Sequence, residues 1–237
     1  MIILVIALAT ILTFVTWILI DNNVLCYVLA ILSIIFLGWS VYILTDHFVN
    51  HTGMEVRSKT TTKQVYSAGS SSVPYGMVIT KEVGKTSGNY VLVYKDKSSD
   101  KKASAHFIPN TKNVTEAVKK TASYKTANVK KATVKTTTKR YVWKSDFYES
   151  LFGFAGEEGD LVSKKSVLTV PKDTWLVLSQ SQAKKLQTLV PKLKAQSQAQ
   201  MKANPQAAKA MMTLAKTNPD KYAAMQVQTI KKALNIK

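Results

Sequence analysis

The sequence predicts an α+β membrane protein, with an N-terminal transmembrane helical hairpin, a small antiparallel β domain (a sandwich or a barrel) and short C-terminal helices. Three observations carry this prediction. Residues 1–45 contain one charged side chain, Asp21. Residues 55–179 alternate short β-branched and aromatic runs with turn-forming residues, which is typical of strands. From residue 180 onward, Ala, Gln and Lys dominate and helix-start signals recur.

Two uncharged runs, residues 2–20 and 24–45, form the predicted hairpin. At about 1.5 Å per residue, each is long enough to cross a hydrocarbon core of about 30 Å. Asp21, Asn22 and Asn23 separate them, and such polar turn formers suit a tight connection between two helices. A cleaved signal peptide fits less well, because no basic residue precedes the first run.

Residues 46–54 are predicted to link the hairpin to the β domain, and they contain a pair of histidines that invites a metal-site interpretation. His47 and His51 are four residues apart, so a continuing helix would place both rings on one face, where they could bind a divalent metal. Thr52 and Gly53 instead indicate that the helix has ended, which favours polar residues at a helix terminus. We therefore predict no metal site and no cofactor. Cys26 is the single cysteine, so no disulfide forms within the chain.

The β domain is predicted to contain two hairpins. Strands are expected at residues 77–80, 89–94, 103–108, 128–138 with an extension at 140–143, 167–170 and 174–178. The first two flank a glycine-bounded turn at 84–88, and the last two flank Pro171, Lys172 and Asp173. Each turn predicts that its flanking strands pair in antiparallel fashion.

The C-terminal region, residues 180–237, is predicted to form three helices at about 180–202, 205–216 and 219–235. Ser179 and Gln182 have the spacing of a capping box, and two Asn-Pro pairs place an N-cap residue before a proline at the first helical position. The apolar stripes of these helices are narrow. They are compatible with docking on the sheet and with lying on lipid.

Positive charge is concentrated after the predicted hairpin. Residues 57–237 contain 33 Lys and Arg, only two of them Arg, against 11 Asp and Glu. Lysine is a hydrated point charge, so this composition suits diffuse attraction to a polyanion better than sequence-specific nucleic-acid recognition. An anionic lipid or wall polymer is the expected partner, with a merely lysine-biased soluble surface as the alternative. The candidate contact residues are Lys119, Lys120, Lys130 and Lys131.

An acidic and aromatic segment, residues 146–160, stands out within the basic domain. Its Phe147, Tyr148, Phe152 and Phe154 are candidates for contact with a partner or with the bilayer interface. The alternative is a core turn whose acids neutralise neighbouring lysines. A hydrolase using two of these carboxylates is a third interpretation. The chain contains neither a Gly-x-Ser-x-Gly elbow nor a phosphate-binding glycine loop, so we predict no catalytic residues and no enzyme activity.

Several short motifs resemble a known family. They are Asp46-His47-Phe48 with Gly53-Met54, Tyr148-x-x-Leu151-Phe152-Gly153, and the run from Val170 to Ser179 that includes Pro171-Lys172-Asp173 and Trp175-Leu176-Val177-Leu178. Together with the two-span start, they resemble a family of uncharacterised small membrane proteins of lactic acid bacteria, over most of residues 1–190. The resemblance implies a location in a bacterial plasma membrane and brings no activity.

The sequence therefore predicts a non-catalytic, membrane-anchored domain that binds an anionic cell-envelope component or a membrane partner. The alternative is an accessory subunit of a transporter or other membrane complex, acting through the hairpin and its few small residues. Two spans predict a multi-pass protein of the plasma membrane. Arg57, Lys59 and Lys63 follow the second span and favour a cytoplasmic domain, whereas the Thr, Ser, Asn and Lys content favours the outside, which we prefer.

Overall fold

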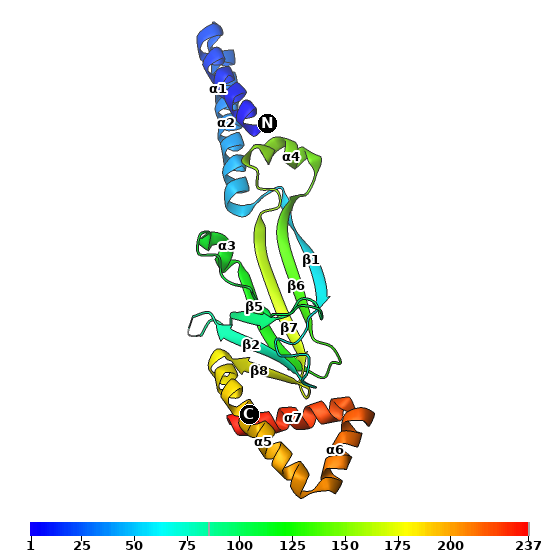
Figure 1. Cartoon of the computed structure of the whole chain (residues 1–237). Helices are drawn as coiled ribbons and strands as arrows, with labels where there is room; N and C mark the ends of the chain where they lie inside the picture. The colour runs from blue at the N-terminus through cyan, green and yellow to red at the C-terminus, as the bar shows by residue number, and fades with distance from the viewer. Residues whose placement is uncertain (85, 237) are drawn as a thin grey trace. The chain divides into compact units, whose positions relative to one another are not determined.

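The structure is a computed structural model that describes all residues except Lys85 and Lys237, and it divides into two compact units (Figure 1). Unit 1 comprises Met1–Lys59 and Thr138–Ser163, and unit 2 comprises Thr60–Thr137 and Lys164–Lys237. Strands β1 (Met54–Gln64), β6 (Thr133–Trp143) and β7 (Leu161–Pro171) contribute residues to both units. Each unit is described separately below.

Unit 1 begins with the two predicted apolar helices, α1 (Ile2–Leu19) and α2 (Asn23–Asn50). Both are long and apolar enough to cross a membrane, and only 17% and 11% of their most apolar windows are buried. Oδ1 of Asn22 accepts hydrogen bonds from the first backbone N–H groups of α2, which explains why that helix starts there. Helix α2 runs five residues past its expected end and stops where His51 adopts a left-handed conformation.

Small side chains make the contact between these two helices. Ala9 of α1 and Ala30 of α2 are almost completely buried, as are Thr16 and Ser40. Small residues allow helix backbones to approach closely. The thiol of Cys26 adds a hydrogen bond to the carbonyl oxygen of Thr16, 3.3 Å away. These small residues are therefore used within the hairpin itself.

The described residues form eight strands, arranged in two four-stranded sheets. The remaining strands are β2 (Gly76–Glu82), β3 (Tyr90–Tyr94), β4 (Ser104–His106), β5 (Lys120–Ala127) and β8 (Trp175–Ser179). The strand order is β1-β6-β7-β5 in one sheet and β4-β3-β2-β8 in the other. Helix α3 (Val114–Val118) precedes β5, and helix α4 (Asp146–Phe152) with the 3-10 helix η1 (Gly153–Ala155) connects β6 to β7.

The structure confirms the first predicted hairpin and shows that the second is wrong. Strands β2 and β3 pair antiparallel, with Ile79 opposite Val93. Strands β7 and β8, in contrast, lie in different sheets: β7 pairs parallel with β5, and β8 pairs parallel with β2. Both sheets are therefore mixed, which corrects the prediction of an antiparallel domain.

Burial on both faces explains the position of β8. Trp175 and Val177 pack against the main core, whereas Leu176 and Leu178 face the C-terminal helices. A strand covered on both sides is apolar at every position, unlike the alternating strands of a hairpin with one solvated face. The connection through Pro171 accordingly carries the chain from one sheet to the other.

The main core of unit 2 contains side chains from both sheets. Its buried members are Val65, Val78, Leu92, Tyr94, Ala132, Val134, Leu168 and Val170. Partly buried aromatic residues, including Phe107 and Tyr124, pack around them. This core supports the loops that form the pocket described below.

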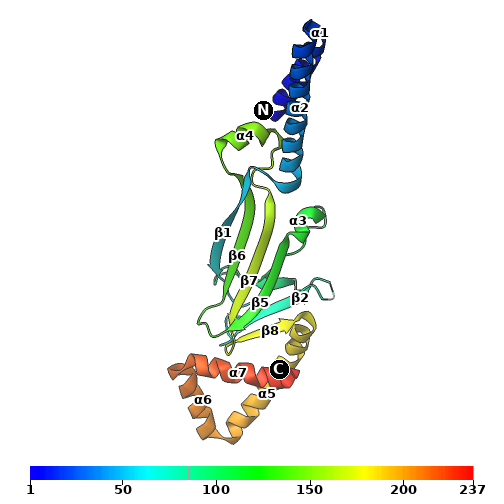
Figure 2. The same cartoon turned by 180° about the vertical axis from the view of Figure 1, so that it is seen from behind.

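The C-terminal helices α5 (Gln180–Ala203), α6 (Pro205–Thr217) and α7 (Pro219–Leu234) match the prediction (Figure 2). Ser179 and Gln182 form the expected capping box, and Asn204 and Asn218 cap the next two helices. Val227 of α7 is buried in a second cluster with residues of β8 and α5. Helices α5 and α7 thus dock on the sheet that contains β8, whereas α6 has no buried residue.

Candidate functional site

Charge is divided unequally between the two units. Unit 2 contains 28 Lys against six Asp and Glu, a net charge of +22. Unit 1, which includes both apolar helices, contains five Lys and Arg against eight Asp and Glu, a net charge of −3. The basic character of the chain therefore belongs entirely to unit 2.

A pocket of about 240 Å³ lies in unit 2, at the N-terminal ends of β5 and β7. Its walls include Lys120 and Ala122 of β5, Lys164 and Ser166 of β7, and the loop of residues 107–110 that follows β4. Two lysines are the only charged side chains in this lining, within the part of the chain that the structure describes.

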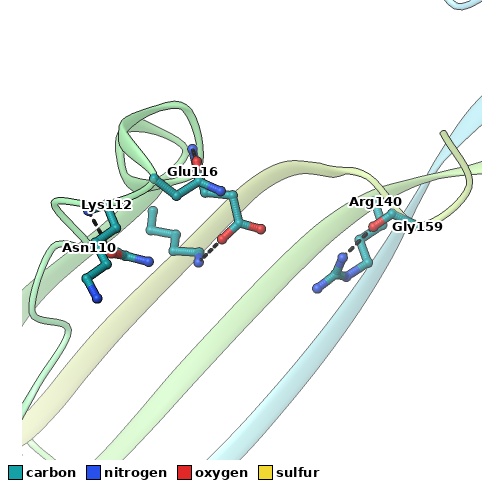
Figure 3. Close-up of polar contacts among 7 residues, drawn as sticks. Asn110, Lys112, Glu116, Arg140 and Gly159 are labelled. Carbon is teal, nitrogen blue, oxygen red and sulfur yellow. Dashed lines mark hydrogen bonds and ion pairs between the residues drawn. The ribbon is translucent and has the colours of Figure 1, made fainter. Parts of the chain in front are cut away.

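The two lysines are direct neighbours in the sheet, because Lys120 and Lys164 are register partners of the parallel pair β5–β7. Like charges placed opposite each other on adjacent strands repel. The positive charge of Lys120 is balanced by Glu116, whose Oε2 atom lies 2.5 Å from Nζ of Lys120. Figure 3 labels Glu116 and marks this contact with a dashed line. Lys164 is only partly exposed and has no ion pair with any residue that the structure describes.

Backbone geometry positions the other walls of the pocket. Oδ1 of Asn89 accepts a hydrogen bond from the backbone N–H of Ala122 at 2.7 Å, so its amide NH₂ group is left to donate elsewhere. Phe107 has a φ of +62°, a left-handed conformation that is strained for a bulky residue. Oδ1 of Asn110 accepts from the backbone N–H of Lys112 at 3.0 Å and fixes the outer end of the loop (Figure 3).

A second polar cluster lies in unit 1, around the fully buried ring of His47. Its Nδ1 atom is 2.8 Å from the carbonyl oxygen of Thr52, and its Nε2 atom is 3.2 Å from Oε2 of Glu157. Nδ1 of His51 lies 4.0 Å from the same carboxylate oxygen. The His47 ring also stacks on Phe152, with centroids 4.1 Å apart. These contacts join the end of α2 to the loop that precedes β7.

The two histidines lie at the C-terminal end of α2, as Thr52 and Gly53 predicted, with His51 as the C-cap residue. No group of three or more His, Cys, Asp or Glu among the described residues is arranged to hold a metal ion. The Nδ1 atom of His47 donates to the carbonyl oxygen of Thr52, whereas His47 Nε2, His51 Nδ1 and Glu157 Oε2 are buried without a hydrogen bond to any described residue. The hydrogen bond to Thr52 and the stacking on Phe152 are therefore the contacts that hold the His47 ring in place within unit 1.

The aromatic candidates of residues 146–160 separate into buried and exposed side chains. Phe152 is fully buried against His47, and this removes it from any contact surface. Tyr148 is half-buried beside Gly53. Phe147 and Phe154 are 67% and 50% exposed and remain available for contact with lipid or a partner.

The lysine candidates lie at the two ends of β5. Lys119 and Lys120 stand at its start, and Lys130 and Lys131 are exposed in the connection that follows its end. Eight residues at about 3.3 Å each separate the two pairs by roughly 26 Å along the strand. They therefore do not form a single site. Lys164 was not predicted from the sequence. Its one distinguishing feature is that it alternates with Ser166, Leu168 and Val170, the positions of β7 that face the core.

Comparison with known families assigns the chain. A family model described as "Domain of unknown function (DUF4811)" matches residues 22–186. The chain belongs to this family. The DUF4811 segment includes α2, all eight strands, the pocket and the His47 cluster, and it leaves α1, α6 and α7 outside. No curated protein matches the chain, and no solved structure matches it.

Membership of DUF4811 confirms the broader part of the resemblance noted in the sequence, namely a family whose function is not assigned. The bacterial source and the two-span character stay predictions, to which we return below.

Proposed function

We propose that this DUF4811 protein is a non-catalytic, membrane-anchored domain that binds an anionic component of a bacterial cell envelope. Helices α1 and α2 would span the plasma membrane, and unit 2 would engage the anion on the outer side. The observation that carries the proposal is the charge division: +22 in unit 2 against −3 in the unit that contains the apolar helices.

The energetics require only a fraction of this charge. Each lysine near an anionic surface contributes about 1 kcal/mol, and the attraction decays within a Debye length of about 10 Å at 0.1 M salt. A few lysines facing one surface therefore give useful binding. The near absence of arginine fits a delocalised polyanion rather than a partner read by bidentate hydrogen bonds.

The exposed rings of Phe147 and Phe154 support the anchoring part of the proposal. Both belong to unit 1, and the ring of Phe154 packs edge-on to Phe48 near the end of α2, with centroids 6.3 Å apart. Exposed Phe side chains are stabilised when they enter the boundary between lipid headgroups and acyl chains. In this proposal, they sit at that boundary.

The test uses the full-length protein in nanodiscs of zwitterionic lipid. Its binding to phosphatidylglycerol vesicles and to a teichoic acid polymer is measured at increasing salt. We expect binding that weakens steeply between about 0.1 M and about 1 M salt, as the Debye length falls to about 3 Å. Binding that is absent for both anions, or insensitive to salt, contradicts the proposal.

Two matched double variants locate the contact. Lys130→Gln with Lys131→Gln removes two exposed charges beside β5, and Lys184→Gln with Lys185→Gln removes two exposed charges from α5. If the predicted lysines carry the contact, only the first pair weakens binding. Equal weakening by both pairs indicates attraction spread over the whole of unit 2.

A further inference from the structure

We propose that the pocket of unit 2 binds a small organic anion, consisting of one carboxylate or phosphate group on a compact apolar body. The site is distinct from the lysine-rich exterior of the same unit, and it does not depend on the membrane-surface binding proposed above. Its anion-binding group is the ammonium of Lys164, with Asn89 as a second donor.

The inward face of β7 leads from the core into this pocket. Alternate residues of a strand point to the same side, so Val170, Leu168, Ser166 and Lys164 share one face. The first three are almost completely buried, and Lys164 continues the series into the pocket wall. A lysine at an inward position is a marked departure from the apolar pattern of the same face.

Charge balance argues that Lys164 takes its counter-ion from a ligand, since no residue that the structure describes forms an ion pair with it. A partly buried ammonium is costly unless a negative charge pairs with it. Glu116 contacts the neighbouring Lys120, and no acidic side chain lies in the described lining of the pocket. Lys120 stands beside Lys164 in register, and its positive charge adds to the demand for an anion.

The opposite wall suits an apolar body attached to the anion. Phe107, Ile108 and Pro109 line the pocket, and Ile108 is 66% exposed at its rim. The left-handed conformation of Phe107 sets the direction of this loop, and strained residues of this kind concentrate at ligand sites. The amide NH₂ of Asn89 supplies a hydrogen-bond donor between the two walls.

The volume limits the ligand. At about 240 Å³, the pocket is slightly smaller than the range of about 300–1,000 Å³ typical of sites for drug-sized molecules. It is large compared with the roughly 30 Å³ that one water occupies in the liquid. A free metabolite and the headgroup of a short-chain anionic lipid share the required chemistry.

The test measures saturable binding to full-length protein in detergent micelles by titration calorimetry and ligand-detected NMR. The probes are phenyl phosphate and benzoate, with benzyl alcohol as the neutral analogue. Dihexanoyl phosphatidic acid competes against phenyl phosphate, to separate a lipid headgroup from a soluble anion. The variants are Lys164→Met and its matched control Lys165→Met, which removes the same charge from the adjacent, solvent-facing position of β7.

We expect one saturable site for at least one of the anionic probes, no binding of benzyl alcohol, and a loss of affinity of about tenfold or more in Lys164→Met only. Because Lys164→Met also removes an unpaired charge, its thermal midpoint without ligand should equal or exceed that of the wild type. A purely structural lysine would instead lower the midpoint.

Two results overturn the proposal. One is the absence of saturable binding of both anionic probes to the wild-type protein. The other is an equal loss of affinity in Lys164→Met and Lys165→Met, which identifies diffuse attraction to the surface instead of a pocket. Neither result bears on salt-dependent binding of vesicles or polymer, so failure here is distinguishable from failure of the proposed function.

Discussion

Replacing Gly53 with alanine should destabilise unit 1 more than any other glycine substitution in that unit. Gly53 lies between α2 and β1 with a φ of +91°, and its carbonyl accepts a hydrogen bond from the backbone N–H of Lys144 at 3.0 Å. A Cβ atom at this position would lie 2.6 Å from Cδ1 of Tyr148. The substitution therefore combines backbone strain with a steric clash.

The two contributions have separate magnitudes. A non-glycine residue in the left-handed region costs about 1–2 kcal/mol. Overpacking against a ring that cannot move freely costs about 1–3 kcal/mol. Together they predict a loss of about 2–5 kcal/mol in the local free energy of opening. Gly153 is the control. Its backbone has right-handed helical dihedral angles, and a Cβ there would come no closer than 3.6 Å to another atom, so Gly153→Ala should be nearly neutral.

The measurement is hydrogen exchange of full-length protein in micelles, followed in peptides that cover residues 46–54 and 140–160, because local opening reports this unit directly. A double-mutant cycle with Tyr148→Ala separates the two terms. Removing the ring should relieve the steric part, so Gly53→Ala should cost only about 1–2 kcal/mol in that background. An unchanged cost with and without the Tyr148 ring would refute the steric argument, and a neutral Gly53→Ala would refute both.

Three further predictions concern unit 2. Gly76→Ala should lower its stability by about 1–3 kcal/mol, measured by thermal unfolding, because a Cβ there would overlap the ring of Trp175. Burial, with a smaller effect of nearby Asp96, raises the pKa of Tyr94, so the phenol ionises more readily when unfolded. Its stabilising contribution is complete below about pH 10 and is lost as pH rises further, and alkaline unfolding should be less steep in Tyr94→Phe. Val227→Ala should cost about 1–3 kcal/mol, whereas truncation of the exposed Met225 should cost almost nothing.

Local signals in the sequence predicted local structure well. The capping residues Ser179, Asn204 and Asn218 act within one helical turn, so the starts of α5, α6 and α7 follow from the sequence alone. The uncharged runs likewise predict α1 and α2. In each case, the residues that decide the structure are neighbours in the chain.

Pairing between distant strands was not predictable in the same way. The turn at Pro171–Asp173 is compatible with a hairpin and with a connection between two sheets, and only the two-sided burial of β8 decides between them. Strand β5 was missed because half of its residues are Lys and Ala, which are depleted in strands. Its parallel partner β7 comes much later in the chain.

The residues of the candidate pocket were likewise predictable only where the deciding signal is local. Lys120 was predicted as a contact residue from charge alone, yet its significance depends on its register with Lys164. That register is a property of the parallel pair β5–β7, which the sequence did not reveal. A polar residue in the inward phase of a strand is the sequence signal that would identify Lys164, once the strand's buried face is known.

The charge division also bears on what the lysines do. If positive charge served mainly to orient the apolar helices, it would be concentrated within about 15–20 residues of their ends. Only Arg57, Lys59 and Lys63 follow α2 at that distance, and unit 1 as a whole is acidic. All the remaining lysines except Lys139 and Lys144 belong to unit 2, which has its own core and docked helices. Orientation of the helices therefore does not account for them, and this is why we propose an anionic partner for unit 2.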